Sequence, residues 1–395
     1  MNSVHFAMEA LFWLSLGLVL HTYFIYPVVL FAGYSLAQLR TDWRYLFGRR
    51  DRRVPALQED TVPGISFLIP AFNEENHLLR KVINLRQMDY PCEKIQIVFV
   101  SDGSTDATNG ILKALLDSNI ETIILPQRSG KATALNRAVA QARHKILVFS
   151  DASTLFAPDA VRKLVRHFVG SRVGAVCGAL KFEAGTESKQ TEGIYWKYES
   201  VLRLMEARLG VTLTASGAVY ALRREAYVPL DSDSVIDDFI IPMNARKAGY
   251  RVAYDPEAIA TDYAPESIEG EFTRRVRIAT GSFQSLMFLL RVEMGGFGRF
   301  AFVSHKLLRW ILPLLLCTLL ISNLALIHYP IYAAFALVQV SFYLWAGLGF
   351  LFRERLQGVG YVLLAYFLLA MHIAFLVGMF RWLTKHHEAT WQRVS

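Results

Sequence analysis

Two stretches of the sequence end an apolar, strand-like run with a serine and an aspartate. In IQIVFVSDGSTDAT the run ends at Asp102, and in KILVFSDAST it ends at Asp151. An aspartate directly after a strand often caps a helix or forms a turn, and Asp106 fits that role. Two such ends in neighbouring units also suit a shared ligand. Carboxylate oxygens there would hold a hard cation such as Mg²⁺ or Mn²⁺, completed by substrate phosphates.

A basic segment, PQRSGKATALNRAV, lies between these two aspartates. Arg128 and Lys131 could face a diphosphate, and Gly130 permits close approach of the backbone. The segment is not a nucleotide-binding P-loop, because Leu125 stands where that motif needs its upstream glycine and Ala132 replaces its serine or threonine.

Strand-like and helical patterns alternate around these residues. This alternation with short connections predicts a doubly wound, mostly parallel sheet, in which ligands bind outside the carboxyl ends of the strands. Asp102 and Asp151 stand at two such ends. We expect strands at residues 64–69, 95–100, 121–125 and 146–149. We expect helices at residues 73–88, 104–118 and 131–142.

The composition indicates a membrane protein. Of the 395 residues 53% are hydrophobic and 19% are charged, and a spanning helix needs about 20 mostly apolar residues. No basic region and cleavage site frame the first stretch, so we expect no removed signal peptide. The three cysteines are far apart and form no metal or disulfide pattern. Four stretches qualify as spans: Met8–Leu39, Leu307–His328, Ile331–Phe352 and Val359–Leu383.

Charge next to these spans predicts their orientation. The tract Arg40–Pro55 is strongly basic, which places the region after it on the cytoplasmic side of the cytoplasmic membrane. The loop Arg353–Gly358 falls on the same side if the helices alternate, and the C-terminal tail then emerges outside, against the rule. The net charge of +8 and the basic tract point to membrane lipids rather than nucleic acid as partners.

A further amphipathic segment follows the middle region. Val276, Ala279, Phe283 and Leu286 recur at helical spacing, which suits a helix on the membrane surface or one that faces the core. We therefore divide the chain into an N-terminal transmembrane helix (1–40), a cytoplasmic domain (41–272), an interfacial helix region (273–300) and a C-terminal region of three transmembrane helices (301–395).

Six segments occur in the order seen in family 2 glycosyltransferases: IPAFNEE, VSDGSTDAT, RSGKATALNRA, FSDAST, SGAVYALRRE and IDDF. The chain resembles that family over residues 64–277, and its apolar helices resemble those of membrane-bound polysaccharide synthases. The resemblance implies a GT-A fold. It also implies an inverting, metal-dependent transfer from a nucleotide sugar, expected to be a UDP-sugar, to a lipid-linked or polysaccharide acceptor in cell-surface or exopolysaccharide synthesis.

The resemblance also implies roles for single residues on the donor side. Pro70 to Glu74 would begin the uridine pocket, and Asp102 would hold the uracil or ribose. Lys131 would approach the diphosphate, and Asn136 would support its loop.

At the reacting centre, Asp151 would sit at the metal as the first acid of the family's D-x-D, with Ser153 in place of the second acid. A single carboxylate still suits Mg²⁺, which commonly uses one or two beside phosphates. Asp238 would be the general base that takes a proton from the acceptor, and Asp237 would position the acceptor.

On the acceptor side, Ser216 and Gly217 of TASGAVYALRRE would lie near the incoming sugar. Processive members carry Q-x-x-R-W after the base. Here Arg274 replaces the glutamine, Arg277 matches the arginine and Ile278 replaces the tryptophan that stacks on the acceptor. Arg277 could still grip the diphosphate, and Arg274 and Arg275 could do the same or face lipid phosphates. The lost tryptophan favours single addition, with a processive synthase that extrudes its polymer as the alternative.

A transporter or receptor with a cytoplasmic binding domain is the alternative from another class. It would carry ionisable residues inside its spans, where this sequence has few beyond His21 and His372. His305, Lys306 and Arg309 precede the second predicted span, and we expect them at lipid headgroups or a lipid diphosphate. An enzyme is therefore the preferred interpretation.

Overall fold

The computed structural model describes residues 3–48, 62–115, 117–169, 172–182, 189–262, 268–353, 355 and 360–384. Most of the segments on which the predicted orientation depends lie outside the described residues. These are residues 49–55 of the basic tract, most of the loop 353–358 and the tail from residue 385.

Strands and helices alternate through the first half of the middle region, as the sequence predicts. The helix expected over 104–118 is shorter, because Asp106 accepts backbone N–H bonds from Thr108 (3.0 Å) and from Glu75 of the neighbouring helix (3.2 Å). The prediction that Asp106 caps this helix is wrong: the N-cap is Ala107, without a side-chain cap bond, and Asp106 instead stabilises the turn before it. The elements are β1 (Ile65–Ala71), α3 (Glu75–Arg86), η3 (Cys92–Lys94), β2 (Ile95–Asp102), α4 (Thr108–Ala114), β3 (Ile120–Leu125), α5 (Lys131–Gln141) and β4 (Ile146–Phe149).

The remaining strands complete an eight-stranded sheet of order β3-β2-β1-β4-β7-β6-β8-β5. Parallel pairs join β1 to β2 and β4, β2 to β3, and β6 to β8, while β7 and β5 pair antiparallel. Every residue of β1, β2 and β4 is buried, as expected for strands covered on both faces. The added elements are β5 (Leu155–Phe156), α6 (Ala160–Val165), η4 (Arg166–Phe168), β6 (Val173–Phe182), β7 (Tyr220–Arg223), η5 (Arg224–Ala226) and β8 (Arg251–Asp262).

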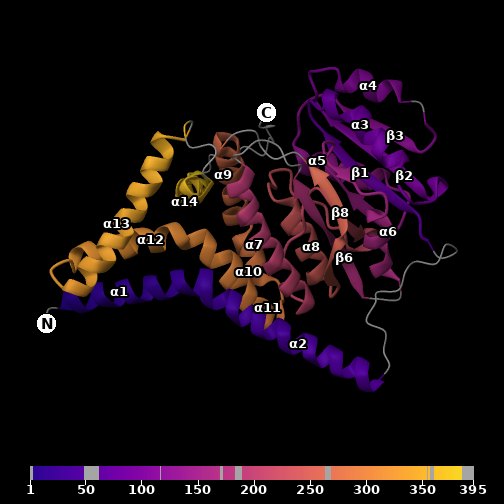
Figure 1. Cartoon of the computed structure of the whole chain (residues 1–395). Coiled ribbons are helices and arrows are strands. Elements are labelled where there is room, and N and C mark those ends of the chain that lie inside the picture. The colour runs from indigo at the N-terminus through magenta and orange to yellow at the C-terminus, as the bar shows by residue number, and fades with distance from the viewer. Residues whose placement is uncertain are drawn as a thin grey trace.

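Within the described residues, four helical segments are long and apolar enough to cross a membrane, one near the N-terminus and three near the C-terminus. The first covers 45 residues, Ser3–Phe47, and continues past the predicted boundary at residue 40. Figure 1 shows these helices on one side and the strand-rich domain on the other. The segments are α1 (Ser3–Leu20), η1 (His21–Ile25) and α2 (Tyr26–Gly48); α11 (Gly295–Ala301), η6 (Phe302–Leu307) and α12 (Leu308–Ala325); α13 (Pro330–Leu351); and α14 (Gly360–Leu383).

Four helices lie between these two parts: α7 (Lys189–Arg208), α8 (Asp237–Lys247), α9 (Ile268–Gln284) and α10 (Leu286–Arg291). The amphipathic segment of the sequence divides at Ser285 into α9 and α10. Its apolar residues Val276, Ala279 and Phe283 are buried, because α9 packs closely on α14. A Cβ placed on Gly378 of α14 would lie 2.5 Å from Ala279 Cβ. A location at the membrane surface remains a prediction.

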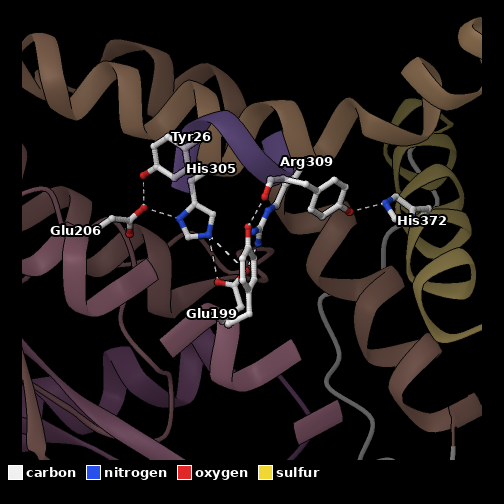
Figure 2. Close-up of polar contacts among 8 residues, drawn as sticks. Tyr26, Glu199, Glu206, His305, Arg309 and His372 are labelled. Atoms are coloured by element: carbon white, nitrogen blue, oxygen red, sulfur yellow. Dashed lines mark hydrogen bonds and ion pairs between the residues drawn. The ribbon is translucent and has the colours of Figure 1, made fainter. Parts of the chain in front are cut away.

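A buried polar network joins α7 to the membrane helices (Figure 2). Tyr26 donates its hydroxyl to Glu206 at 2.7 Å, and the His305 ring lies between Glu206 (2.5 Å) and Glu199 (3.2 Å). Arg309 pairs with the same Glu199. The helical segment that contains the second predicted span begins at Gly295, so His305 and Arg309 lie within that segment, and their place at lipid headgroups stays a prediction. We call these five residues the membrane-side network.

Candidate active site

Asp102 ties the end of β2 to the loop that precedes α5. Its two carboxylate oxygens accept backbone N–H bonds from Ser129 (2.7 Å) and Gly130 (2.9 Å). Gly130 has φ 90°, a left-handed conformation that glycine adopts without strain. The contact places Lys131, the first residue of α5, beside the carboxyl ends of β1, β2 and β4.

Lys131 lies at the centre of three carboxylates. Its Nζ is 2.9 Å from Asp151 Oδ1 and 3.5 Å from Asp237 Oδ2. A Cβ on Gly217 would lie 3.4 Å from Asp238 Cβ and 3.7 Å from Lys131 Nζ, so Asp238 is close by. Residues that are 107 positions apart in the sequence therefore meet at one edge of the sheet. We call Lys131, Asp151, Asp237 and Asp238 the acid–lysine cluster.

The charges of this cluster shift the pKa values of Lys131 and Asp237. Burial opposes the charge of Lys131, but Asp151, Asp237 and Asp238 raise its pKa above the ordinary value. Burial raises the pKa of Asp237 to about 6; Lys131 opposes that shift, and Asp238 and Asp151 add to it. Asp237 is 7% exposed, whereas Asp238 is only half-buried. Of the two, Asp238 is therefore the better placed to meet a second substrate.

Asp151 has the exposure and the charge to hold a divalent cation. Its side chain is 27% exposed, and a cation shared with phosphate oxygens needs only one or two such carboxylates. The described residues contain no group of three or more His, Cys, Asp or Glu side chains arranged to hold a metal by themselves. The residues therefore fit a cation that a phosphorylated ligand completes.

Ser153, the other predicted metal ligand, directs its hydroxyl elsewhere. It hydrogen-bonds to Asp262 at the end of β8, as does Thr154 at 2.8 Å. Burial and the charge of Asp151 raise the pKa of Asp262. The second carboxylate near Asp151 thus comes from β8 and not from the position of Ser153.

Comparison with known proteins agrees with this geometry. Residues 66–228 match the family model described as Glycosyl transferase family 2. This part of the chain is a family 2 glycosyltransferase domain. A poly-beta-1,6-N-acetyl-D-glucosamine synthase of Staphylococcus aureus (strain MSSA476) is 27% identical over 240 residues, which are 59% of this chain and 58% of that protein. The Staphylococcus epidermidis protein of that name is 26% identical over 237 residues, 58% of this chain and 57% of its own.

The chain thus spans about 58% of the length of the first of these curated relatives. A solved mannosyltransferase from Pyrobaculum calidifontis, in complex with GDP-Man and Mn²⁺, has a similar fold. It is 22% identical, the match covers 91% of this chain and 98% of that chain, and the TM-score is 0.66. The family 2 domain therefore has the expected GT-A fold, here together with four apolar helices.

The predicted nucleotide side of the family 2 domain lies at the same sheet edge. Pro70 is buried near the end of β1, and Glu74 is 3% exposed just after it, with its N–H bonded to Thr108 at 2.8 Å. Arg128 stacks over the Phe72 ring at 3.9 Å, and its buried Nε and Nη2 donate to no acceptor among the described residues. Such N–H groups suit an incoming anion.

Asn136 serves a different loop from the one we expected. Its amide donates to the Leu230 carbonyl (2.8 Å) and accepts from the Tyr227 hydroxyl (2.7 Å) and the Leu230 N–H (2.9 Å). It therefore braces the 227–230 segment, which precedes α8. Contact of Asn136 with substrate stays a prediction.

The arginines of α9 differ in their surroundings. Arg274 pairs with the buried Glu271 at 3.2 Å, whereas Arg277 lies in the field of Asp237, Asp151 and Asp238. Arg277 is thus within electrostatic range of the acid–lysine cluster, and its contact with a diphosphate stays a prediction. Ser216 forms an isolated bridge to Val219, next to Gly217.

One residue of this site is missing from the sequence prediction. Lys81 of α3 is fully buried and donates to Ser150 Oγ (2.6 Å) and to the Thr154 carbonyl (2.5 Å). Burial lowers its pKa to about 7, against the charges of Asp151 and Asp262. Lys81 therefore holds both ends of the loop that carries Asp151. In the sequence it occupies a buried helix position, and no local pattern distinguishes it.

Proposed function

We propose that the protein transfers a hexose with inversion from a UDP-sugar to a lipid-linked or polysaccharide acceptor, in exopolysaccharide synthesis. The observation that carries the proposal is the acid–lysine cluster at the carboxyl edge of the sheet in a family 2 domain. The names of the curated relatives support a carbohydrate polymer as the pathway's product.

The residues divide into two sides around the reacting bond. On the donor side, Lys131, Arg128 and Arg277 supply positive charge for the diphosphate, and Asp102 fixes the loop that carries two of them. Asp151 and the donor phosphates would hold a divalent cation, which would supply positive charge beside the departing diphosphate. The mannosyltransferase of similar fold was solved with Mn²⁺, which supports such a cation here.

On the acceptor side, Asp238 takes the proton from the attacking hydroxyl. Its half-buried carboxylate lies close to Gly217 and to Lys131. Attack from the face opposite the leaving diphosphate inverts the anomeric carbon. A positioned base of this kind contributes about 10²–10⁴-fold to the rate.

The test is nucleotide release by the purified full chain with a panel of donors, including UDP-N-acetylglucosamine and GDP-mannose, each with and without Mn²⁺. Asp238→Asn should bind the donor as the wild type does but lose about 10²–10⁴-fold in transfer. Asp151→Asn should instead weaken Mn²⁺-dependent donor binding. Wild-type turnover in Asp238→Asn would refute the assignment of the base.

A processive synthase is the second candidate, because the curated relatives carry the names of polymer synthases. Ile278 in place of the stacking tryptophan favours single addition. Sizing the product on a gel separates the two candidates: one added sugar supports single transfer, and a ladder to high polymer supports the synthase.

We also propose that the catalytic domain faces the cytoplasm, where nucleotide sugars are made, with residues 41–272 as the domain and 273–300 at the membrane surface. Protease treatment of right-side-out and inverted vesicles tests this. Cleavage within the catalytic domain only in inverted vesicles is expected.

A further inference from the structure

The last turns of α2 carry an exposed stripe of apolar side chains. Their exposed fractions lie between 56% and 78%, and the Trp43 and Phe47 rings stack with their centroids 5.1 Å apart. The residues recur at helical spacing, so they share one face of the helix. Exposed apolar groups of this size mark a surface that contacts a membrane or another protein. The residues, which we call the α2 stripe, are Leu36, Leu39, Trp43, Leu46 and Phe47.

A different face of α2 packs on the rest of the protein. Tyr26 and Leu30 belong to a buried cluster with Leu202 of α7, and a Cβ on Gly33 would lie 3.5 Å from Leu209 Cδ1. Figure 1 shows α2 beneath the strand-rich domain, extending away from α12 and α13. The helix is therefore held by one face, and the α2 stripe is exposed on another.

The α2 stripe continues a face of the first membrane-spanning segment. Val28 lies eleven residues before Leu39, and Val29 lies seven residues before Leu36. Both intervals are close to whole turns of an α-helix, and both valines are exposed. They belong to Ser3–Phe47, a single helical segment that is apolar enough to cross a membrane. The face that would meet hydrocarbon in the span therefore reaches the end of α2.

Charged residues beside the α2 stripe favour the membrane surface over the hydrocarbon core. Arg40 and Arg44 are exposed in the same turns, and a charge near the bilayer centre is costly. Residues 40–53 include six arginines and two aspartates, an excess of positive charge that anionic headgroups attract. Trp43 and Tyr45 are residue types enriched at headgroup level. The pattern is that of an amphipathic helix that lies in the interface.

A second copy of the chain fits the α2 stripe less well than a bilayer does. Two copies that paired through this face would bring their basic residues 40–53 close together, and like charges oppose association. Water fits it least, because the apolar side chains would stay hydrated. An anionic bilayer matches both the apolar residues and the charge.

We propose that the α2 stripe docks the last turns of α2 onto an anionic bilayer surface, with its apolar side chains among the acyl chains and Arg40 and Arg44 at the headgroups. Since another face of α2 packs on α7, this contact holds α7 beside the membrane. The proposal does not depend on the proposed function, because lipid contact is measured without sugar transfer.

Spin labels on the full chain in vesicles test the contact. The vesicles contain equal parts of dioleoyl phosphatidylcholine and dioleoyl phosphatidylglycerol. Cys92→Ser and Cys317→Ser first remove the exposed cysteines, and this background, treated with the label in the same way, is the blank. Leu39→Cys and Leu46→Cys then place labels on the α2 stripe. Thr41→Cys, exposed on a different face of the same turns, is the matched control.

Two relaxing reagents report where each label lies: oxygen concentrates among acyl chains, and a charged nickel complex stays in water. Leu39→Cys and Leu46→Cys should have an oxygen-to-nickel ratio several-fold above that of Thr41→Cys. A ratio as low as that of Thr41→Cys would mean that α2 projects into water. Low access of both reagents to the stripe labels would mean that protein covers them. Either result overturns the proposal. All three side chains are exposed, so the substitutions leave the core intact.

The preference for anionic lipid is tested with the label at Leu46→Cys. Replacing phosphatidylglycerol by phosphatidylcholine should lower the oxygen-to-nickel ratio, and Arg40→Gln together with Arg44→Gln should remove this dependence. Arg251→Gln, at an exposed arginine of β8, is the control and should keep it. The anionic part of the proposal is overturned if the lipid exchange changes nothing in the chain with both arginines, or if the double variant responds as strongly.

Discussion

Two groups of buried charges differ in how far their carboxylates are satisfied. In the membrane-side network each carboxylate is matched: Glu206 by Tyr26 and His305, and Glu199 by His305 and Arg309. In the acid–lysine cluster a single lysine serves three aspartates, and Asp237 Oδ2 has no hydrogen-bond donor within the described residues.

The contrast separates a structural role from a binding role. A buried pair with its partners in place fixes how elements sit together, and removing one partner leaves an uncompensated charge. A group with more acids than cations attracts further positive charge, and perturbed pKa values are common at such functional sites. We therefore expect the membrane-side network to govern stability and the acid–lysine cluster to govern activity.

The largest expected effect on stability tests the membrane-side network. Glu206→Ala leaves His305 and Tyr26 without their acceptor and should lower the free energy of unfolding by about 3–5 kcal/mol. Thermal unfolding in detergent measures this. The control Glu225→Ala, at an exposed position, should change stability by less than about 0.5 kcal/mol. Unchanged stability in Glu206→Ala would contradict the structural role of the membrane-side network.

The contact between α9 and α14 is close, and its tightness is the next test. A Cβ on Gly378 would lie 2.5 Å from Ala279 Cβ and 2.8 Å from the Val276 carbonyl oxygen. Gly378→Ala should therefore cost about 1–3 kcal/mol by overpacking. At Gly347 of α13 a Cβ meets nothing within 4 Å, so Gly347→Ala should not destabilise. Equal unfolding temperatures for the two variants would show that α9 is not tightly held.

A smaller effect is expected at Lys81, which holds the loop of Asp151. Lys81→Met removes both hydrogen bonds to that loop, and misplacement of a reacting group slows catalysis. We expect kcat to fall roughly tenfold, equivalent to about 1.4 kcal/mol, without loss of thermal stability because a buried charge is removed. The exposed Lys113→Met in α4 is the control. If stability fell and kcat did not, Lys81 would be a structural residue only.

The smallest effect concerns pH. The pKa of Asp237 is about 6 in the folded chain and 3.8 ordinarily, so the folded chain holds the proton more tightly. Its contribution to stability is present below pH 4 and is lost as the pH rises through 6. Relative to the wild type, Asp237→Asn should gain about 1 kcal/mol between pH 5 and pH 8. Unfolding curves at both values measure it, and a pH-independent difference would contradict the shift.

The sequence predicted the elements from β1 to β4 because each strand is a short apolar run and each helix repeats its apolar residues at helical spacing. It also placed Asp102, Asp151 and Lys131 at one edge, since parallel strands bring their carboxyl ends together. These predictions depend on patterns within short stretches of the sequence, and the folded chain keeps the secondary structure that those patterns predict.

Other features depend on contacts between distant residues. Lys81 meets Thr154 across 73 positions, and Thr154 meets Asp262 across 108; no spacing rule connects them. The antiparallel insertion of β7 beside β4 was likewise invisible, because a four-residue strand gives no sign of its direction. The break between α9 and α10 falls at a serine, which is a weak signal in a helix.

The 45-residue helical segment at the N-terminus has a consequence for the environment in which the protein works. At 1.5 Å per residue it is about 68 Å long, more than twice the ~30 Å hydrocarbon core of a bilayer. Part of it must therefore tilt or project from the lipid. Its second half, α2, packs against α7, so the projecting part would hold the strand-rich domain close beside the membrane.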